Sequence, residues 1–424
     1  MAIVLAERLK RVKPSPTVAL TGRVARLKAE GKDIVGLGVG EPDFDTPVHI
    51  ADAGVDAIRK GFTRYTAVEG IPDLKDAIIA KFRRDNGIAY TRPQILVSTG
   101  AKQTIYNLFM AVIDPGDEVI IPAPYWVSYP DIALLAEGTP ITPYAGPDQG
   151  YKITPAQLEA AISPKTRLFM LNSPSNPTGA AYTSAELHAL GAVLRRHPDV
   201  LIATDDMYEH IFWAKEPFCS FLTACPDLYD RTVTINGVSK SYAMTGWRIG
   251  YCGGPATIID AMSTIQSQST SNPSSIAQRA AVVALSGDQS CVAEMNKHFK
   301  ARHDYFNGRP QCPARLQASC RPRARSTPGA TSAKPITHAR PGRRPRVRRV
   351  PARQRPWWRA CPARDSAPRA TSASRSRSAC RRSRRRWSAW ARPWPAHDPA
   401  ERGRALTKRA ANRKIGGSFE TVPT

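Results

Sequence analysis

Several features that would point to a particular class of protein are missing from this sequence of 424 residues. Its eight cysteines include no pair at the CxxC spacing that zinc and thiol redox sites use. No apolar run reaches the roughly 20 residues that a membrane helix needs. The apolar start, MAIVLA, is too short for a signal peptide. We therefore expect no metal site and no membrane partner, and we expect a cytoplasmic location.

Acidic residues are almost absent from the last part of the chain. Residues 307–424 contain 31 Lys and Arg but only 4 Asp and Glu, whereas residues 1–306 contain 30 and 31. One segment therefore carries the excess behind the formal net charge of +26. A non-enzymatic nucleic-acid binder is one interpretation of this segment. Five of the eight Trp lie in it, however, and disordered basic arms usually contain few aromatic residues. We expect no specific nucleic-acid partner.

Short apolar runs alternate with amphipathic stretches between residues 33 and 286. We expect strands within residues 95–100, 117–124, 166–174, 200–208, 232–239 and 247–254, and a helix over residues 101–113. Strands that alternate with helices indicate an α/β fold with a mainly parallel sheet, covered on both faces. In such sheets chemistry gathers at the carboxyl ends of the strands.

A lysine and an arginine follow one of these strands in SKSYAMTGWRIG, as Lys240 and Arg248. An amine held at a strand end near another cation has a lowered pKa and can attack a carbonyl carbon. For a lone lysine the alternative is a solvated surface position. The turn Gly100–Lys102 joins a strand to a helix, where backbone N–H groups can bind an anion.

Other polar and aromatic groups would complete a site for one kind of ligand. Asp205 stands at a strand end, with Tyr208 three residues later, and Asn176 precedes a proline in a fixed turn. Trp126 is either a flat stacking surface or a core aromatic. Together with the lysine, the arginine and the anion-binding turn, these groups match an aromatic pyridine that carries an aldehyde, a phenolic oxygen and a phosphate.

Four ordered segments carry a family resemblance: VGEPDFDTP, YTAVEGIPDLKDAI, SPSNPTG and SKSYAMTGWRIGY. They resemble those of the class I/II fold-type I aminotransferases, which use pyridoxal 5′-phosphate (PLP). The resemblance covers Leu5 to about Phe306. It implies the PLP-dependent transferase fold type I, with a mainly parallel, seven-stranded mixed sheet in a large domain and a second, small α/β domain.

The resemblance also implies a role for each matching residue. Lys240 would form the Schiff base with PLP and shuttle the proton, Asp205 would hold the ring nitrogen, and Tyr208 with Asn176 would meet the ring oxygen. The other implied contacts are Gly100, Ala101, Lys102 and Arg248 at the phosphate, Trp126 over the ring and Gly40 against the substrate carboxylate. Trp126 and Asn176 are expected to contact substrate too. Tyr65 would reach the phosphate of a neighbouring subunit, so a homodimer is expected.

The implied reaction moves an amino group between an L-amino acid and a 2-oxo acid by a ping-pong mechanism. Lys13, in VKPSPTVAL, resembles a lysine of the subgroup that acts on aspartate and, in some members, on prephenate. There the lysine meets the side-chain carboxylate, so we expect aspartate and 2-oxoglutarate as substrates. A solvated N-terminal lysine is the alternative for Lys13. An alanine or aromatic amino-acid aminotransferase is the alternative activity.

We expect four parts in the chain. They are an arm with a small-domain piece (1–46), the PLP-binding large domain (47–286), a linking helix (287–306) and an Arg/Pro/Ala/Ser-rich region (307–424). The last part shows no sustained period of 2 or 3.6 residues. It also lacks the family's R-I-S or R-L-S strand, whose arginine clamps the substrate α-carboxylate. We therefore expect a disrupted small domain and a disordered last part.

A shifted reading frame accounts for this composition. RATSASRSR, residues 369–377, can be encoded as CGG GCT ACG TCC GCA TCT CGT TCG CGT. Read from the third base, the same string encodes Gly-Tyr-Val-Arg-Ile-Ser-Phe-Ala, which is the missing arginine strand. The hypothesis is that the region is family sequence translated in another frame.

Overall fold

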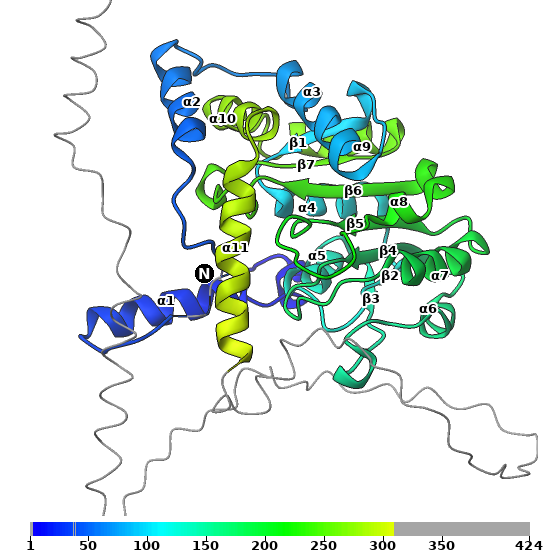
Figure 1. The fold of residues 1–424 in the computed structure, drawn as a ribbon. Coiled ribbons are helices and arrows are strands. Elements are labelled where there is room, and N and C mark those ends of the chain that lie inside the picture. Colours follow the sequence, from blue (N-terminus) through cyan, green and yellow to red (C-terminus); the bar gives the residue numbers. More distant parts are fainter. Residues whose placement is uncertain (1–2, 37, 39, 309–424) are drawn as a thin grey trace, which may run out of the picture. The chain divides into compact units, whose positions relative to one another are not determined.

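The structure is a computed structural model that describes residues 3–36, 38 and 40–308. Seven strands form one sheet in the order β1-β7-β6-β5-β4-β2-β3 (Figure 1). The strands are β1 (Ile95–Ser98), β2 (Glu118–Ile120), β3 (Thr139–Ile141), β4 (Thr166–Asn172), β5 (Leu201–Asp205), β6 (Thr232–Gly237) and β7 (Gly250–Gly253). Strand β7 runs antiparallel to β1 and β6, and the other neighbouring strands are parallel. The predicted mainly parallel, mixed sheet of seven strands is confirmed.

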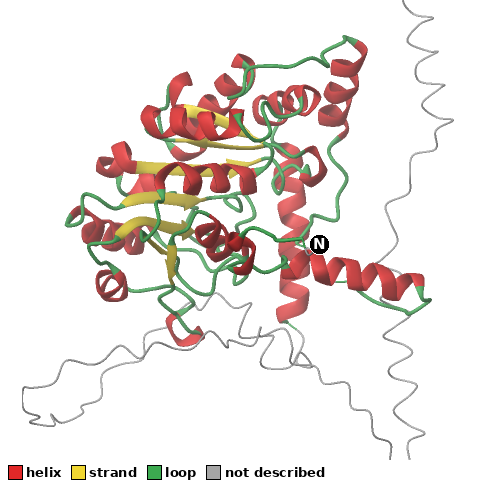
Figure 2. Cartoon of the chain, turned by 180° about the vertical axis from the view of Figure 1, so that it is seen from behind, coloured by secondary structure: helices red, strands yellow, loops and turns green. Residues whose placement is uncertain are grey.

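Helices cover both faces of the sheet (Figure 2). The helices of the described residues are α1 (Pro16–Ala29), α2 (Val48–Arg59), α3 (Pro72–Lys81), α4 (Ala101–Val112), α5 (Ser128–Leu135), α6 (Pro155–Ala161), α7 (Ser184–Arg195), α8 (Phe221–Ala224), α9 (Ala256–Ser267), α10 (Ser275–Ser286) and α11 (Ser290–Asn307), of which α1 projects away from the sheet. Alternate residues of a strand face opposite sides. Leu96 accordingly packs with α4, α5 and α9, whereas Ile95 and Val97 pack with α3 and α10. Helices α6, α7 and α8 cover the second face further along, over β4 and β5.

The predicted strands correspond to six of the seven observed ones, and the predicted helix over 101–113 is α4. Strand β3 was not predicted because it is only three residues long and contains Pro140. It pairs with β2 alone, at the edge of the sheet, where a proline removes no shared hydrogen bond.

No helix within the described residues is long and apolar enough to cross a membrane. The division of the chain at residues 46, 286 and 306 stays a prediction, although α11 lies close to the predicted linking helix. Asn307, the first residue of the predicted disordered part, is the last residue of α11, whereas residues 309–424, including the arginine-strand segment, lie outside the described ones.

Candidate active site

The register of the sheet brings the predicted site segments to one edge. Asn172 of β4 lies beside Asp205 of β5. Gly250, two residues after Arg248, pairs with Ser98 of β1 on one side and with Gly237 of β6 on the other. The chain reaches Lys240 three residues after β6 ends. Because β7 is antiparallel, its beginning lies at the same edge as the carboxyl ends of the parallel strands.

Asp205 is a buried carboxylate at the end of β5. The Tyr129 hydroxyl donates a hydrogen bond to its Oδ2 at 2.7 Å, and the Met207 N–H donates to its Oδ1 at 3.2 Å. Burial raises the pKa of Asp205, and these two hydrogen bonds and the Lys240 charge offset the rise only in part. A cationic partner, such as a protonated ring nitrogen, would therefore stabilise the ionised carboxylate.

Tyr208 and Asn176 meet at the same edge of the sheet. Asn176 Nδ2 donates to the Tyr208 hydroxyl at 3.3 Å. Asn172 holds both segments, since its Oδ1 accepts from the Asn176 N–H at 2.7 Å and its Nδ2 donates to the Asp205 carbonyl at 2.8 Å. Burial and the nearby Asp205 raise the pKa of Tyr208 to about 12. The phenol therefore stays protonated at neutral pH and can donate a hydrogen bond.

Lys240 extends its amine toward the segment before α2. Its Nζ donates to the Gly40 carbonyl at 2.6 Å. Burial lowers the pKa of Lys240, Arg248 lowers it further, and the carboxylates of Glu41 and Asp205 counteract the decrease in part. A lowered pKa increases the fraction of neutral amine, the form that attacks a carbonyl carbon and accepts a proton.

The beginning of α4 forms an anion cradle with Arg248. The N–H groups of Ala101 and Lys102 are the first of the helix, so they have no acceptor within it. Gly100 has a φ of +85°, and a Cβ there would lie 2.3 Å from a guanidinium nitrogen of Arg248. A Cβ at Gly250 would lie 2.1 Å from the Ala101 nitrogen. The two glycines thus allow the guanidinium and the helix start to lie close together.

Trp126 lies beside this cradle. The Lys102 Nζ lies 4.9 Å from the centre of its ring, and the Tyr129 ring meets it edge to face with centroids 5.2 Å apart. Burial, with Arg248 nearby, lowers the pKa of Lys102. Trp126 is half-buried, so it packs in the core and also presents part of its surface.

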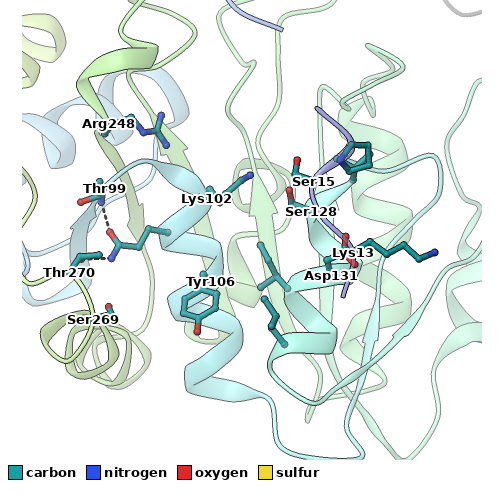
Figure 3. A pocket seen from close by; sticks show the side chains of 15 residues that line it. Lys13, Ser15, Thr99, Lys102, Tyr106, Ser128, Asp131, Arg248, Ser269 and Thr270 are labelled. Carbon is teal, nitrogen blue, oxygen red and sulfur yellow. Dashed lines mark hydrogen bonds between the residues drawn. The ribbon is translucent and has the colours of Figure 1, made fainter. Parts of the chain in front are cut away.

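A cavity of about 460 Å³ opens beside the cradle (Figure 3). Lys102 and Arg248 line it, and so does Lys13. Figure 3 shows Lys13 on the wall opposite Arg248, with its side chain pointing away from Lys102. Tyr65 does not join this group, because its side chain is 93% exposed. The structure thus brings the other predicted contacts to one edge and leaves Tyr65 in contact with solvent.

Two residues of this site were missed from the sequence, Tyr129 and Asn172. Tyr129 lies in the first turn of α5, three residues after Trp126, and its closeness in sequence to that predicted site residue was a usable signal. Asn172 is the last residue of β4, the strand expected within residues 166–174. Its role as the link between Asn176 and Asp205 depends on the register of β4 and β5.

These residues fit PLP. The anion cradle suits a phosphate dianion, the buried Asp205 suits a protonated ring nitrogen, and the phenol of Tyr208 suits an anionic ring oxygen. Lys240 supplies the amine. The fold and this donor set together define a PLP-dependent enzyme of fold type I.

Comparison with known proteins places the chain in a family. Residues 32–309 match the family described as aminotransferase class I and II. The chain is 63% identical to the aspartate/prephenate aminotransferase of Nitrosomonas europaea over 301 residues, which are 71% of this chain and 76% of that protein. The chain belongs to the class I and II aminotransferase family, and PLP is its cofactor.

Solved structures agree with this assignment. The aspartate aminotransferase of Rhizobium meliloti is 50% identical, with a TM-score of 0.70 over 72% of this chain and 77% of that one. The aspartate aminotransferase of Thermus thermophilus with maleate is 40% identical, with a TM-score of 0.68 over 72% of this chain and 79% of that one.

Proposed function

We propose that the protein is an aspartate aminotransferase, which transfers the amino group of aspartate to 2-oxoglutarate. The observation that carries the proposal is the shared sheet edge, where a buried carboxylate at Asp205 and an amine with lowered pKa at Lys240 lie near an anion cradle. The test is an assay of aspartate with 2-oxoglutarate in the chain with the restored reading frame. Transfer of the amino group to give glutamate and oxaloacetate is the expected result.

The side chains have separate tasks in this reaction. Bound PLP supplies an electrophilic carbon and an electron-accepting ring. Lys240, as a neutral amine, removes the proton from the α-carbon of the amino acid and later delivers it to the carbon that carries the aldehyde oxygen in free PLP. Asp205 keeps the ring nitrogen protonated, and Tyr208 donates a hydrogen bond to the ring oxygen. The reaction then runs in reverse with the 2-oxo acid, which gives ping-pong kinetics.

Replacing Asp205 with alanine is expected to leave PLP bound, because the cradle at Gly100–Lys102 and Arg248 is unchanged. Proton removal should slow about a hundredfold or more, since a negative charge at the ring nitrogen is lost. Single-turnover absorbance with aspartate measures the step. Asp205→Asn keeps the size of the side chain and should be equally slow. Near-normal turnover in both variants would contradict the assignment.

Lys13 is proposed to bind the side-chain carboxylate of aspartate. Its place on the wall of the cavity, opposite Arg248, supports this role, and its side chain must turn toward the cavity to fulfil it. Maleate, named with the Thermus relative, is a four-carbon dicarboxylate like the carbon skeleton of aspartate.

Lys13→Ala should lower kcat/KM for aspartate by about tenfold to a hundredfold, the range of a charge-assisted hydrogen bond. Activity on alanine, which has no side-chain carboxylate, should stay constant. Lys10→Ala is the control, because Lys10 lies on the same arm and pairs at the surface with Glu7. Equal losses on aspartate and alanine would exclude the role for Lys13.

We also propose a homodimer and a cytoplasmic location. Exposed apolar side chains on the N-terminal segment, together with the exposed ring of Tyr65, support burial against a second copy. These apolar residues are Ile3, Val4, Leu5, Leu9 and Val18.

The cysteines support the cytoplasmic location. The four cysteines of the described residues are free thiols, as is usual in a reducing compartment. Sedimentation of the protein and fractionation of cells test the two statements.

A further inference from the structure

A buried ion pair lies behind the active site, between Lys81 at the end of α3 and Glu209. Lys81 is 1% exposed and Glu209 is 5% exposed. Neither residue belongs to the site described above. Removing two charges from water is costly, so a pair this deeply buried needs good geometry and further hydrogen bonds to be stable. Glu209 directly follows Tyr208, which makes the surroundings of this pair relevant to the site.

Both oxygens of the Glu209 carboxylate accept hydrogen bonds. Its Oε1 accepts from Asn236 Nδ2 at 2.8 Å and from the Lys81 amine. Its Oε2 accepts from Asn86 Nδ2 at 2.8 Å, and the Oδ1 of Asn86 accepts from Lys81 at 2.8 Å. Three separate segments therefore meet at this carboxylate: the end of α3 with the turn after it, strand β6, and the segment of Glu209 itself.

The local backbone explains how Lys81 and Asn86 come together. Residues Phe82–Asn86 form a π-helical turn after α3. In a π-turn residues five apart stack along the axis, and Lys81 and Asn86 are five apart. Such turns occur often at functional sites.

Further charges surround the pair. The His210 Nε2 lies 3.4 Å from both Asp85 Oδ2 and Glu209 Oε1. Asp85 Oδ2 lies 3.8 Å from the Lys81 amine, and Arg84 holds the Asp85 carboxylate through two hydrogen bonds. Burial raises the pKa of Glu209, but Lys81 and His210 outweigh it, so its pKa lies below its usual value. Glu209 is therefore ionised at neutral pH.

Two of the three segments carry groups of the site. Asp205 is the last residue of β5, and Glu209 directly follows Tyr208 in the turn after that strand. Asn236 is the penultimate residue of β6, the strand that leads to Lys240, and its Oδ1 accepts from the Gly237 N–H at 2.7 Å. The Glu209 carboxylate is thus a direct link between the Asp205 turn and the strand that presents the lysine.

We propose that Glu209 is a positioning residue, which fixes the turn of Asp205 and Tyr208 against the strand that leads to Lys240, with Lys81 as its buried counter-charge. The inference rests on the proposed function, because those three residues are the groups that Glu209 positions. A small displacement of cofactor-binding groups weakens binding strongly, since their hydrogen bonds depend on distance and angle.

The test uses the full chain and two readouts of cofactor binding, the Kd for PLP and the visible circular dichroism of the bound cofactor. Glu209→Gln should raise the Kd about tenfold to a hundredfold and weaken the dichroism. It also leaves the buried Lys81 ammonium with no carboxylate nearer than Asp85, at 3.8 Å, so the melting temperature should fall by about 10 °C. Asn236→Ala, which removes the hydrogen bond from β6 to Glu209 and the one from the Gly237 N–H, should change the two cofactor readouts in the same direction.

The double variant Lys81→Met/Glu209→Gln separates positioning from stability. It contains no unpaired buried charge, so its melting temperature should recover relative to Glu209→Gln. Its affinity for PLP should stay low, because the carboxylate that joined the segments is gone. Arg231→Met is the matched control. Arg231 donates to three carbonyls, those of Leu194, His197 and Val200, at the opposite end of β6. Arg231→Met should have a lower melting temperature than the unsubstituted chain and an unchanged Kd for PLP.

The outcomes are distinct. If the double variant regains both stability and affinity, or if Arg231→Met loses as much affinity as Glu209→Gln, the pair is only structural and the positioning role is overturned. If the unsubstituted chain binds PLP without borohydride fixing it to Lys240, the proposed site itself fails. In that case the inference drawn from it fails as well.

Discussion

Replacing Lys240 with alanine is expected to abolish transamination, with a loss of about 10⁴-fold or more in kcat, because one amine serves as both nucleophile and proton carrier. Burial lowers the pKa of this amine, and its Nζ donates to the carbonyl of Gly40, the residue expected to lie against the substrate carboxylate. The rate is measured with the protein whose reading frame has been restored. The absorbance of bound PLP, in the near ultraviolet to blue, can be measured with the full chain as it stands. In Lys240→Ala, the absorbance band of the lysine-linked cofactor should disappear.

Lys102 is the sharpest control for this prediction. Its amine lies at the same edge of the sheet, near Arg248 and over the Trp126 ring, and burial lowers its pKa too. Borohydride reduction followed by mass mapping should place PLP on Lys240 in the unsubstituted chain and in Lys102→Ala. A reduced adduct on Lys102, or an unchanged absorbance in Lys240→Ala, would show that the reactive amine is Lys102, at the start of α4, and not Lys240.

The main features of the fold follow from the sequence because buried parallel strands are short, apolar and separated by helices. ILVS, TRLFMLN and TVTING all lie where they were expected, as β1, β4 and β6. Lys240 and Asp205 were recognisable because they stand where such strands end, and the strand ends share one edge. The short edge strand β3, with its proline, gave no comparable signal.

Tertiary contacts between distant polar residues were not predictable in the same way. Lys81, in KFRRDNG, and Glu209, in MYEH, have the composition of solvated charges, yet both are buried. Their burial depends on the π-helical turn at Phe82–Asn86 and on the packing of that turn against the end of β5. The hydrogen bond from Tyr129 to Asp205 likewise joins residues 76 positions apart. No local periodicity reports such a pairing.

The similarity to known proteins ends close to residue 306, where the composition of the chain changes. The family match ends at residue 309, and the Nitrosomonas relative is matched over 76% of its length. The family's second domain would lie in the unmatched quarter. We propose that residues after about 307 are translated in a shifted frame, as the hidden Gly-Tyr-Val-Arg-Ile-Ser string within residues 369–377 indicates. The nucleotide sequence around codon 307 tests this directly.

Restoring the reading frame is expected to raise kcat/KM for aspartate with 2-oxoglutarate by about a thousandfold or more. A bidentate pair between an arginine and the substrate carboxylate, in a site closed to water, contributes several kcal/mol to transition-state binding. The chain as it stands should also aggregate, because α11 leaves Tyr305 and Phe306 exposed where the second domain would continue. Both proteins should bind PLP, since the cradle, Asp205 and Lys240 all precede residue 307. Equal activity of the two proteins, each with PLP bound, would show that the basic region replaces the second domain. The frameshift hypothesis would then have to be abandoned.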